Sequence, residues 1–332
     1  MSATVDLPHA PPGGSIPQPI VVVDDHGIQD TIFRIGVRAS GYFVLLLLFL
    51  IGVFLFLQGW PALHRAGLRF FTDSGFNTLV KHPVYGVLAS LVGTLEVAAV
   101  AMVVGTPVAI ATALFLSEYA PVWSRRTLIA LIDLAAAIPS IIFGLWAVYE
   151  LSDNVVGVST WLSHHVGFLP FFKVVSPPLN GSIFIAGLVV GIMIVPIVAS
   201  ICREVFSLAP PGEREAALAL GASRWQMIRS VVIPFGRGGI IGAVMLGLGR
   251  ALEETIAVTI ILANSYTISP HILQHGGSTI SQLIASQFGS GGKLGTQVLL
   301  MIGFVLFVIT LVINLIASAI VNRSRSGAGV DL

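Results

Sequence analysis

The sequence is poor in charged residues, in lysine and in cysteine. Only 10% of its 332 residues are Asp, Glu, Lys or Arg, whereas an ordinary soluble domain has about 25%. The single cysteine, Cys202, excludes an internal disulfide and a cysteine-rich metal site. The formal net charge of +1 gives no reason to expect a nucleic-acid partner. None of the three lysines is followed by Ser or Thr, so the chain lacks the G-x-x-x-x-G-K-[ST] loop of nucleotide-hydrolysing domains.

Long apolar stretches dominate what is present. Hydrophobic residues make up 55% of the chain, and a helix that crosses a bilayer needs about 20 predominantly apolar residues in succession. Pro107 and Pro139 lie inside the second and third stretch, where a proline bends or breaks a helix. We therefore predict an all-α integral membrane protein. Its six predicted transmembrane helices are residues 40–57, 88–116, 128–151, 182–201, 238–263 and 297–321.

The two ends of the chain differ from this apolar part. Residues 1–34 hold five prolines and four aspartates, and we predict a disordered tail there. Residues 35–322 form the predicted transmembrane domain, and residues 323–332 a second tail. With the N-terminus inside, eleven arginines lie on the inner side and five Arg or Lys residues on the outer side. This bias of positive charge places both tails and the loop 202–235 in the cytoplasm.

A polar island separates the fourth and fifth predicted helices and reads PGEREAALALGASRWQMIRSVVIP. Its charges exclude it from the hydrocarbon of a bilayer. Two short helices are predicted around Gly221, which suits a turn with a left-handed backbone. Ser223 should cap the second short helix, and Pro234 should end it. Ala216 and Ala217 should be exposed, and such small side chains let another protein approach closely, as at a docking surface.

The fifth predicted helix carries three charged residues, Arg250, Glu253 and Glu254. Each charge costs roughly 2.5–3.5 kcal/mol at the centre of a bilayer. Arg250 and Glu254 are four residues apart, lie on one helical face and can pair. The pair either locks helix packing or serves a water-filled path, in which the guanidinium contacts an oxyanion and the carboxylates keep it from binding too tightly. We favour the path, which is the usual role of ionisable groups inside membranes. Gly238-x-x-x-Gly242 is a close-packing pattern that fits a subunit interface or packing within the chain.

The polar island resembles a known family motif. Glu215-Ala216-Ala217, then Gly221 and Val231-x-Ile233-Pro234, resemble the EAA loop of ABC importer permeases. The resemblance implies six helices in the type I permease arrangement of these importers, and a coupling helix that docks on a cytoplasmic ATPase. The alternative is an amphipathic segment that rests on lipid headgroups. The implied docking residues are Glu215, Ala216, Ala217, Gly221, Arg224 and Pro234.

A second resemblance is more specific. The run GRALEETIAV, which contains Arg250 and Glu254, is similar to GRALGETMAV of phosphate importer permeases of the PstC type. The run LSEYAP, with Glu118 at its centre, agrees with the same family. The likeness implies that Arg250 and Glu254 line a phosphate path. Glu253 stands where the family usually has Gly; we expect it at the path because it lies beside these two residues and adds a negative charge. The likeness also implies a multi-pass subunit of the inner membrane that imports inorganic phosphate and needs neither cofactor nor metal.

The resemblance implies partners as well: a pair of cytoplasmic ATPase subunits, a second permease of the PstA type, and a phosphate-binding protein that is periplasmic or a lipoprotein. Two rival functions stay open. One is a permease for another oxyanion, such as molybdate or sulfate. The other is a proton-coupled secondary transporter that uses Glu253 or Glu254 as a proton relay. An intramembrane hydrolase ranks last, because the predicted helices hold no nucleophile–base pair.

Overall fold

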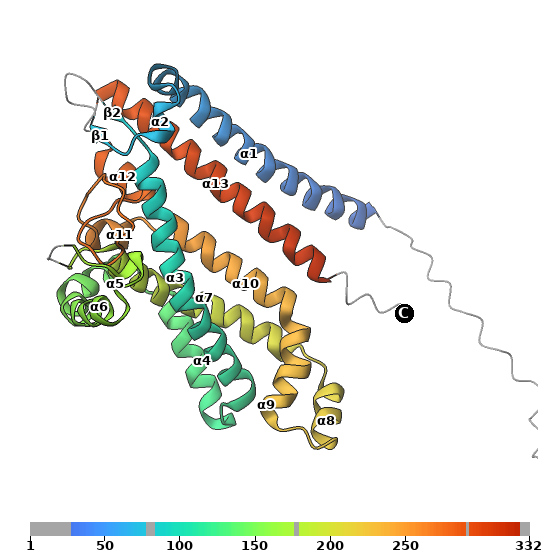
Figure 1. Ribbon diagram of the computed structural model, residues 1–332. Helices are drawn as coiled ribbons and strands as arrows, with labels where there is room; N and C mark the ends of the chain where they lie inside the picture. The colour runs from blue at the N-terminus through green and yellow to red at the C-terminus, as the bar shows by residue number, and fades with distance from the viewer. Residues whose placement is uncertain (1–27, 78–83, 176–178, 290–291, 326–332) are drawn as a thin grey trace, which may run out of the picture. The chain divides into compact units, whose positions relative to one another are not determined.

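The computed structural model describes residues 28–77, 84–175, 179–289 and 292–325 (Figure 1). The predicted tails lie mostly outside the described residues. The first helix, α1 (Ile28–Ala66), and the last, α13 (Gly292–Arg325), both extend into the stretches expected to be tails. The chain divides into two compact units, Met1–Ile51 and Gly52–Leu332, and α1 runs through the border between them.

The described residues contain six helical segments that are long and apolar enough to cross a membrane, which confirms the predicted number. Three of these segments continue through short π-helical turns, so each combines several elements. The segments are Asp30–Ala66 within α1; Leu88–Tyr119, made of α3 (Leu88–Leu114) and η1 (Phe115–Tyr119); Ser140–Val166, made of α5 (Ser140–Trp146), η2 (Ala147–Leu151) and α6 (Ser152–Val166); Ile183–Ser207, which is α7; Arg224–Glu253, made of α9 (Arg224–Met227), η4 (Ile228–Val232) and α10 (Ile233–Glu253); and Gly292–Val321 within α13.

The third span lies further along the chain than predicted. The predicted helix 128–151 is broken, because α4 (Val122–Ala136) ends before Pro139 and a new helix begins at Ser140. A residue that precedes a proline is disfavoured in helical conformation, so Ile138 marks the break. Pro139 itself has an extended backbone (ψ 138°) and stands at the N-cap of α5. The span therefore starts after the proline and runs to Val166.

The fifth span starts earlier and ends earlier than the predicted 238–263. Pro234 was predicted to end the preceding short helix, and this prediction is wrong: α9 continues through the π turn η4 into α10. Pro234 stands in the first turn of α10, next to the wider π turn, where its missing N–H is tolerated. At the other end α10 stops at Glu253, and a separate short helix, α11 (Ile256–Ile261), follows.

Short elements connect these spans. Two strands form a small antiparallel hairpin in the first connection, a minor exception to the all-α prediction. The connecting elements are α2 (Arg69–Thr72), β1 (Phe76–Asn77), β2 (Val84–Tyr85), η3 (Pro170–Phe172), α8 (Pro211–Ala219) and α12 (Ile280–Gln287).

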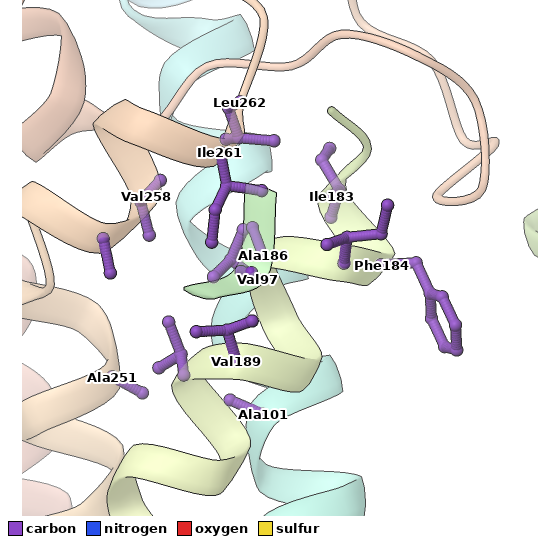
Figure 2. Packing of buried hydrophobic residues seen from close by; sticks show 14 of the residues in the cluster. Val97, Ala101, Ile183, Phe184, Ala186, Val189, Ala251, Val258, Ile261 and Leu262 are labelled. Carbon is purple, nitrogen blue, oxygen red and sulfur yellow. The ribbon is translucent and has the colours of Figure 1, made fainter. Parts of the chain in front are cut away.

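The helix α7 forms the core of the second unit. In its most apolar window 72% of the residues are buried inside the protein, so it is an inner helix of the bundle. It packs along α3, where glycines allow the backbones to touch: a Cβ on Gly105 would lie 2.6 Å from the backbone oxygen of Gly191. Figure 2 shows Val97 and Ala101 of α3, Ala186 and Val189 of α7, and Ala251 near the end of α10 gathered in this core. The core thus fixes α10 against α7.

Candidate functional site

The helix α10 ends because Glu254 leaves the helical conformation. Its backbone is extended (φ −64°, ψ 123°), and its Oε1 accepts a hydrogen bond of 3.1 Å from the backbone N–H of Ala257 in α11. The Glu254 carboxylate therefore satisfies one of the free N–H groups in the first turn of the next helix. On the far side, the Ser281 hydroxyl donates to the backbone oxygen of Glu254 at 2.8 Å. The charged segment is a fixed corner between α10, α11 and α12.

The predicted ion pair is present at this corner, although Glu254 lies beyond the end of α10 and not on a helical face shared with Arg250. Arg250 Nη2 lies 2.9 Å from Glu254 Oε2. The two partners differ in burial, since the Glu254 side chain is 2% exposed and the Arg250 side chain 41%. Within the described residues, Glu254 Oε2 accepts no hydrogen bond of normal geometry, so its interaction with Arg250 is the attraction between opposite charges. Arg250 is thus held from one side by a buried carboxylate and is accessible from the other.

Glu253 has different surroundings from Glu254. Its side chain is exposed and borders an open groove with Thr255, Ser281 and Leu306. Among the described residues no ion pair is recorded for it. Its backbone oxygen accepts a hydrogen bond of 3.0 Å from the Thr255 hydroxyl. Glu253 is therefore an accessible carboxylate one residue away from the buried pair.

We give the name open face to five residues of α10 that have an accessible side chain or free space beside them: Gly242, Leu246, Gly249, Arg250 and Glu253. Gly242, Leu246, Gly249 and Glu253 are spaced by three or four positions and Arg250 lies four positions after Leu246, so the five lie along one side of the helix. A Cβ on Gly242 or on Gly249 would meet no atom within 4 Å. Leu246 is 54% exposed. A stripe of glycine and leucine thus leads along α10 to the two accessible charged groups.

Gly242 does not make the close packing expected of it within the described residues, because a Cβ there would meet no atom within 4 Å, and two other glycines of α10 pack closely instead. A Cβ on Gly239 would lie 2.3 Å from a side-chain atom of Val205, and one on Gly247 would lie 2.7 Å from Val198. Both valines belong to α7. The rotation of α10 against α7 thus brings Gly239 and Gly247, and not Gly242, into contact with α7.

The polar island folds into the two predicted short helices, α8 and α9. Gly221 has φ +84°, the left-handed conformation predicted for the turn. Ser223 caps α9 as predicted: its hydroxyl accepts from the Gln226 N–H at 3.3 Å, and the Gln226 side chain accepts from the Ser223 N–H at 2.7 Å. These reciprocal bonds form a capping box.

The residues expected to dock on a partner are mostly accessible. Glu215 and Ala216 are exposed, whereas Ala217 is half-buried against the apolar cluster beneath α8. Gly221 and Pro234 are exposed. The face of α8 that carries Glu215 and Ala216 is the part of the loop that another protein can reach.

Arg224, also expected to dock, is held within the chain. Its Nη1 donates to the backbone oxygen of Glu118 at 3.1 Å, and its guanidinium lies 5.5 Å from the centre of the Tyr119 ring. Arg214 of α8 reaches the same turn, with Nη1 3.1 Å from Glu118 Oε1. The LSEYAP run therefore contacts the polar island directly, a meeting that sequence spacing did not predict.

A further polar cavity lies at the ends of α3 and α7 that are remote from α8. It is lined by Glu96, Ser265, His271, His275 and Ser278, among others. No sequence pattern predicted it, because its residues come from α3, α7 and the connection between α11 and α12. The described residues contain no group of three or more His, Cys, Asp or Glu side chains arranged to hold a metal ion.

Comparisons with known proteins show which family the chain belongs to. The family model described as "Binding-protein-dependent transport system inner membrane component" matches residues 105–326. The chain is 39% identical over 302 residues to the "Phosphate transport system permease protein PstC 2" of Mycobacterium tuberculosis, covering 90% of this chain and 93% of the relative. It is 41% identical over 279 residues to the "Phosphate transport system permease protein PstC" of Mycobacterium leprae, covering 83% and 88%.

A solved structure shows the same fold at lower identity. The crystal structure of a bacterial alginate ABC transporter, in complex with an alginate pentasaccharide-bound periplasmic protein, contains a chain that is 20% identical to this one. The TM-score is 0.55, and the match covers 89% of this chain and 97% of that chain. The likeness confirms the predicted fold of ABC importer permeases. The chain belongs to the family of binding-protein-dependent transport system inner membrane components.

Proposed function

We propose that this chain is the permease subunit of an ATP-driven importer that moves inorganic phosphate inward across the cell membrane. The observation that carries the proposal is the similarity, along most of the chain, to relatives named as phosphate transport system permeases. The similarity of the GRALEETIAV run to phosphate importer permeases supports the same substrate.

In this proposal Arg250 is a transient contact for the passing anion. Its guanidinium offers forked N–H donors that match the oxygens of phosphate. The buried Glu254 carboxylate, 2.9 Å away, holds the guanidinium in place and partly neutralises it. The accessible Glu253 adds a second negative charge nearby. Both carboxylates lower the affinity of Arg250 for an anion, and a pathway needs weak binding because the ion must leave again.

The open face of α10 supports a second permease subunit as a partner. Arg250 and Glu253 belong to a membrane-spanning segment, and charged groups there are costly in contact with lipid. A second permease, of the PstA type, would cover the open face and enclose a water-filled path along it. The small Gly242 and Gly249 leave room for a close approach by that partner.

Energy comes from another chain in this proposal, since the sequence carries no G-x-x-x-x-G-K-[ST] loop for binding ATP. A pair of cytoplasmic ATPase subunits docks on the exposed face of α8, which carries Glu215 and Ala216. This orientation puts both termini in the cytoplasm and is supported by the bias of arginine toward that side. A phosphate-binding protein delivers the anion from the opposite side.

Reconstitution tests the proposal. The chain is placed in lipid vesicles with its ATPase pair, the second permease and the binding protein, and uptake of radiolabelled phosphate is measured. We expect uptake that requires ATP, persists when a protonophore collapses the proton gradient, and resists competition by excess sulfate or molybdate. Uptake without the ATPase that collapses with the gradient would instead support a secondary transporter. Preferential ATP-driven uptake of molybdate or sulfate would assign another oxyanion.

A further inference from the structure

Two arginines of the polar island, Arg214 and Arg224, bind Glu118 in the turn η1 at the end of the second span. We propose that Glu118, Tyr119, Arg214 and Arg224 form a loop anchor, which transmits the movement of α8 to α3 when the ATPase works. The four are positioning residues, because they act on the path through the helices that they connect. The inference rests on the proposed docking of an ATPase at α8.

Arg214 joins three elements through one guanidinium. Its Nη1 lies 3.1 Å from Glu118 Oε1 and also donates to Oε2 at 3.4 Å. Its Nη2 donates to the backbone oxygen of Phe206, near the end of α7. Arg214 itself belongs to α8, Glu118 to the π turn η1, and Phe206 to α7. A displacement of α8 therefore pulls on the ends of both spans.

This ion pair is shielded from solvent. The Glu118 side chain is 6% exposed and the Arg214 side chain 21%. The pair Arg203–Glu204 provides a contrast: Arg203 is 20% exposed, but the two charged atoms are 3.7 Å apart and the Glu204 side chain is 67% exposed. A pair whose carboxylate is in water contributes little, whereas loss of one partner from a shielded pair leaves a charge without compensation.

Arg224 holds the same turn from the other side of Gly221. Its Nη1 donates to the Glu118 backbone oxygen at 3.1 Å, and its guanidinium lies over the Tyr119 ring. The chain leaves the helix at Ala120, which has an extended backbone (ψ 129°). Carbonyls at such a helix end lack partners within the helix and attract cations. Both arms of the polar island, α8 and α9, are thus fixed to η1.

The anchored turn leads directly to the proposed path. The helix α3 continues from η1 and packs along α7 through contacts as close as that of Gly105 with Gly191. Tightly packed helices move as rigid bodies or switch between discrete arrangements. A pull on Glu118 therefore shifts α3 against α7, the helix that also packs against α10, which carries Arg250. The loop anchor thus connects the ATPase to the second span, in addition to the fifth span, which begins with α9.

Charge reversal and charge exchange test the loop anchor. The variants are Arg214→Glu, Glu118→Arg and the two combined, with Arg203→Glu, Glu204→Arg and their combination as matched controls. Each is reconstituted as the full complex, and phosphate uptake and ATP hydrolysis are measured in the same vesicles. We expect uptake per ATP hydrolysed to fall about tenfold in each single anchor variant, because the shielded pair is broken. The combined anchor variant should recover part of the loss, and the controls should keep the ratio of the native complex.

A milder variant covers the case in which charge reversal prevents assembly. Arg214→Lys keeps the charge, but a single ammonium group cannot hold the Glu118 carboxylate and the Phe206 carbonyl in the same forked geometry. We expect an assembled complex with a lower ratio of uptake to hydrolysis.

Two results would overturn the inference: an unchanged ratio of uptake to hydrolysis in the assembled single variants, or a lowered ratio that shows no recovery in the combined variant. The native complex separates this inference from the proposed function. Failure of the native complex to import phosphate defeats the proposed function, whereas native import combined with unaffected anchor variants defeats the loop anchor alone.

Discussion

The Arg250–Glu254 pair allows the stability and the transport role of one residue to be separated. Replacing Arg250 with Gln leaves the carboxylate of Glu254, which is 3% exposed, without its counter-charge. Loss of one partner from a buried pair costs about 3–5 kcal/mol of stability. Arg250 is 41% exposed and water screens it in part, so we expect the lower end, about 3 kcal/mol. The hydrogen bond from Ala257 to Glu254 stays in place in this variant.

The double variant Arg250→Gln, Glu254→Gln removes both charges together. A glutamine at position 254 keeps an oxygen that accepts from the Ala257 N–H, so we expect stability within about 1 kcal/mol of the native chain. Phosphate uptake should stay as low in the double variant as in the single variant, because neither carries the guanidinium. A hydrogen bond to a charged group contributes about 1.5–3 kcal/mol, and each 1.4 kcal/mol is a factor of about ten. We therefore expect phosphate uptake to fall by about tenfold to hundredfold in both variants.

Thermal unfolding of the purified chain in detergent measures the stability of each variant. Phosphate uptake by the reconstituted complex measures its transport. Arg237→Gln is the matched control, because Arg237 is an exposed arginine near the start of the same helix. Near-native uptake by the double variant would falsify the pathway role of Arg250. A single variant as stable as the native chain would show that Glu254 does not depend on its partner.

Three further changes have defined outcomes. Gly221→Ala should weaken co-purification with the ATPase, because the left-handed backbone at φ +84° costs a residue with a side chain about 1 kcal/mol. Gly221→Asn, which tolerates that conformation, should retain more binding. Equal binding by the two variants would contradict the backbone explanation. Gly105→Ala should destabilise the chain by about 1–3 kcal/mol in a thermal melt, because its Cβ would meet the backbone oxygen of another helix; Gly157→Ala, which meets no atom within 4 Å, serves as its control. Glu253→Gly removes an accessible negative charge beside Arg250 and should alter the rate or the anion selectivity of uptake; unchanged kinetics would make Glu253 a bystander.

Much of the fold could be predicted, because each span is encoded by a local run of apolar residues. The six spans, the polar island, and the turn at Gly221 with its Ser223 cap are all local features, and the structure confirms them. The errors concern helix ends, two of them at prolines and one at Glu253, where α10 stops ten residues before the predicted end. Pro139 breaks a helix, whereas Pro234 is accommodated inside one by a π turn. Composition alone does not distinguish the two cases, because the outcome depends on the packing of the neighbouring turns.

The sequence alone determined that the chain is a membrane protein, how many times it can cross, and which charged residues stand in unusual places, since these follow from hydropathy and from residue type. Apart from the Arg250–Glu254 pair, which the spacing predicted, only the tertiary structure decided what those charges contact. Arg214 and Glu118 are 96 positions apart and meet because the Arg214 side chain of α8 reaches the turn η1 that follows α3. Glu253 and Glu254 are adjacent, yet one is exposed and the other buried, because α10 ends between them. Helix rotation and helix ends set such contacts, and they depend on packing between distant segments.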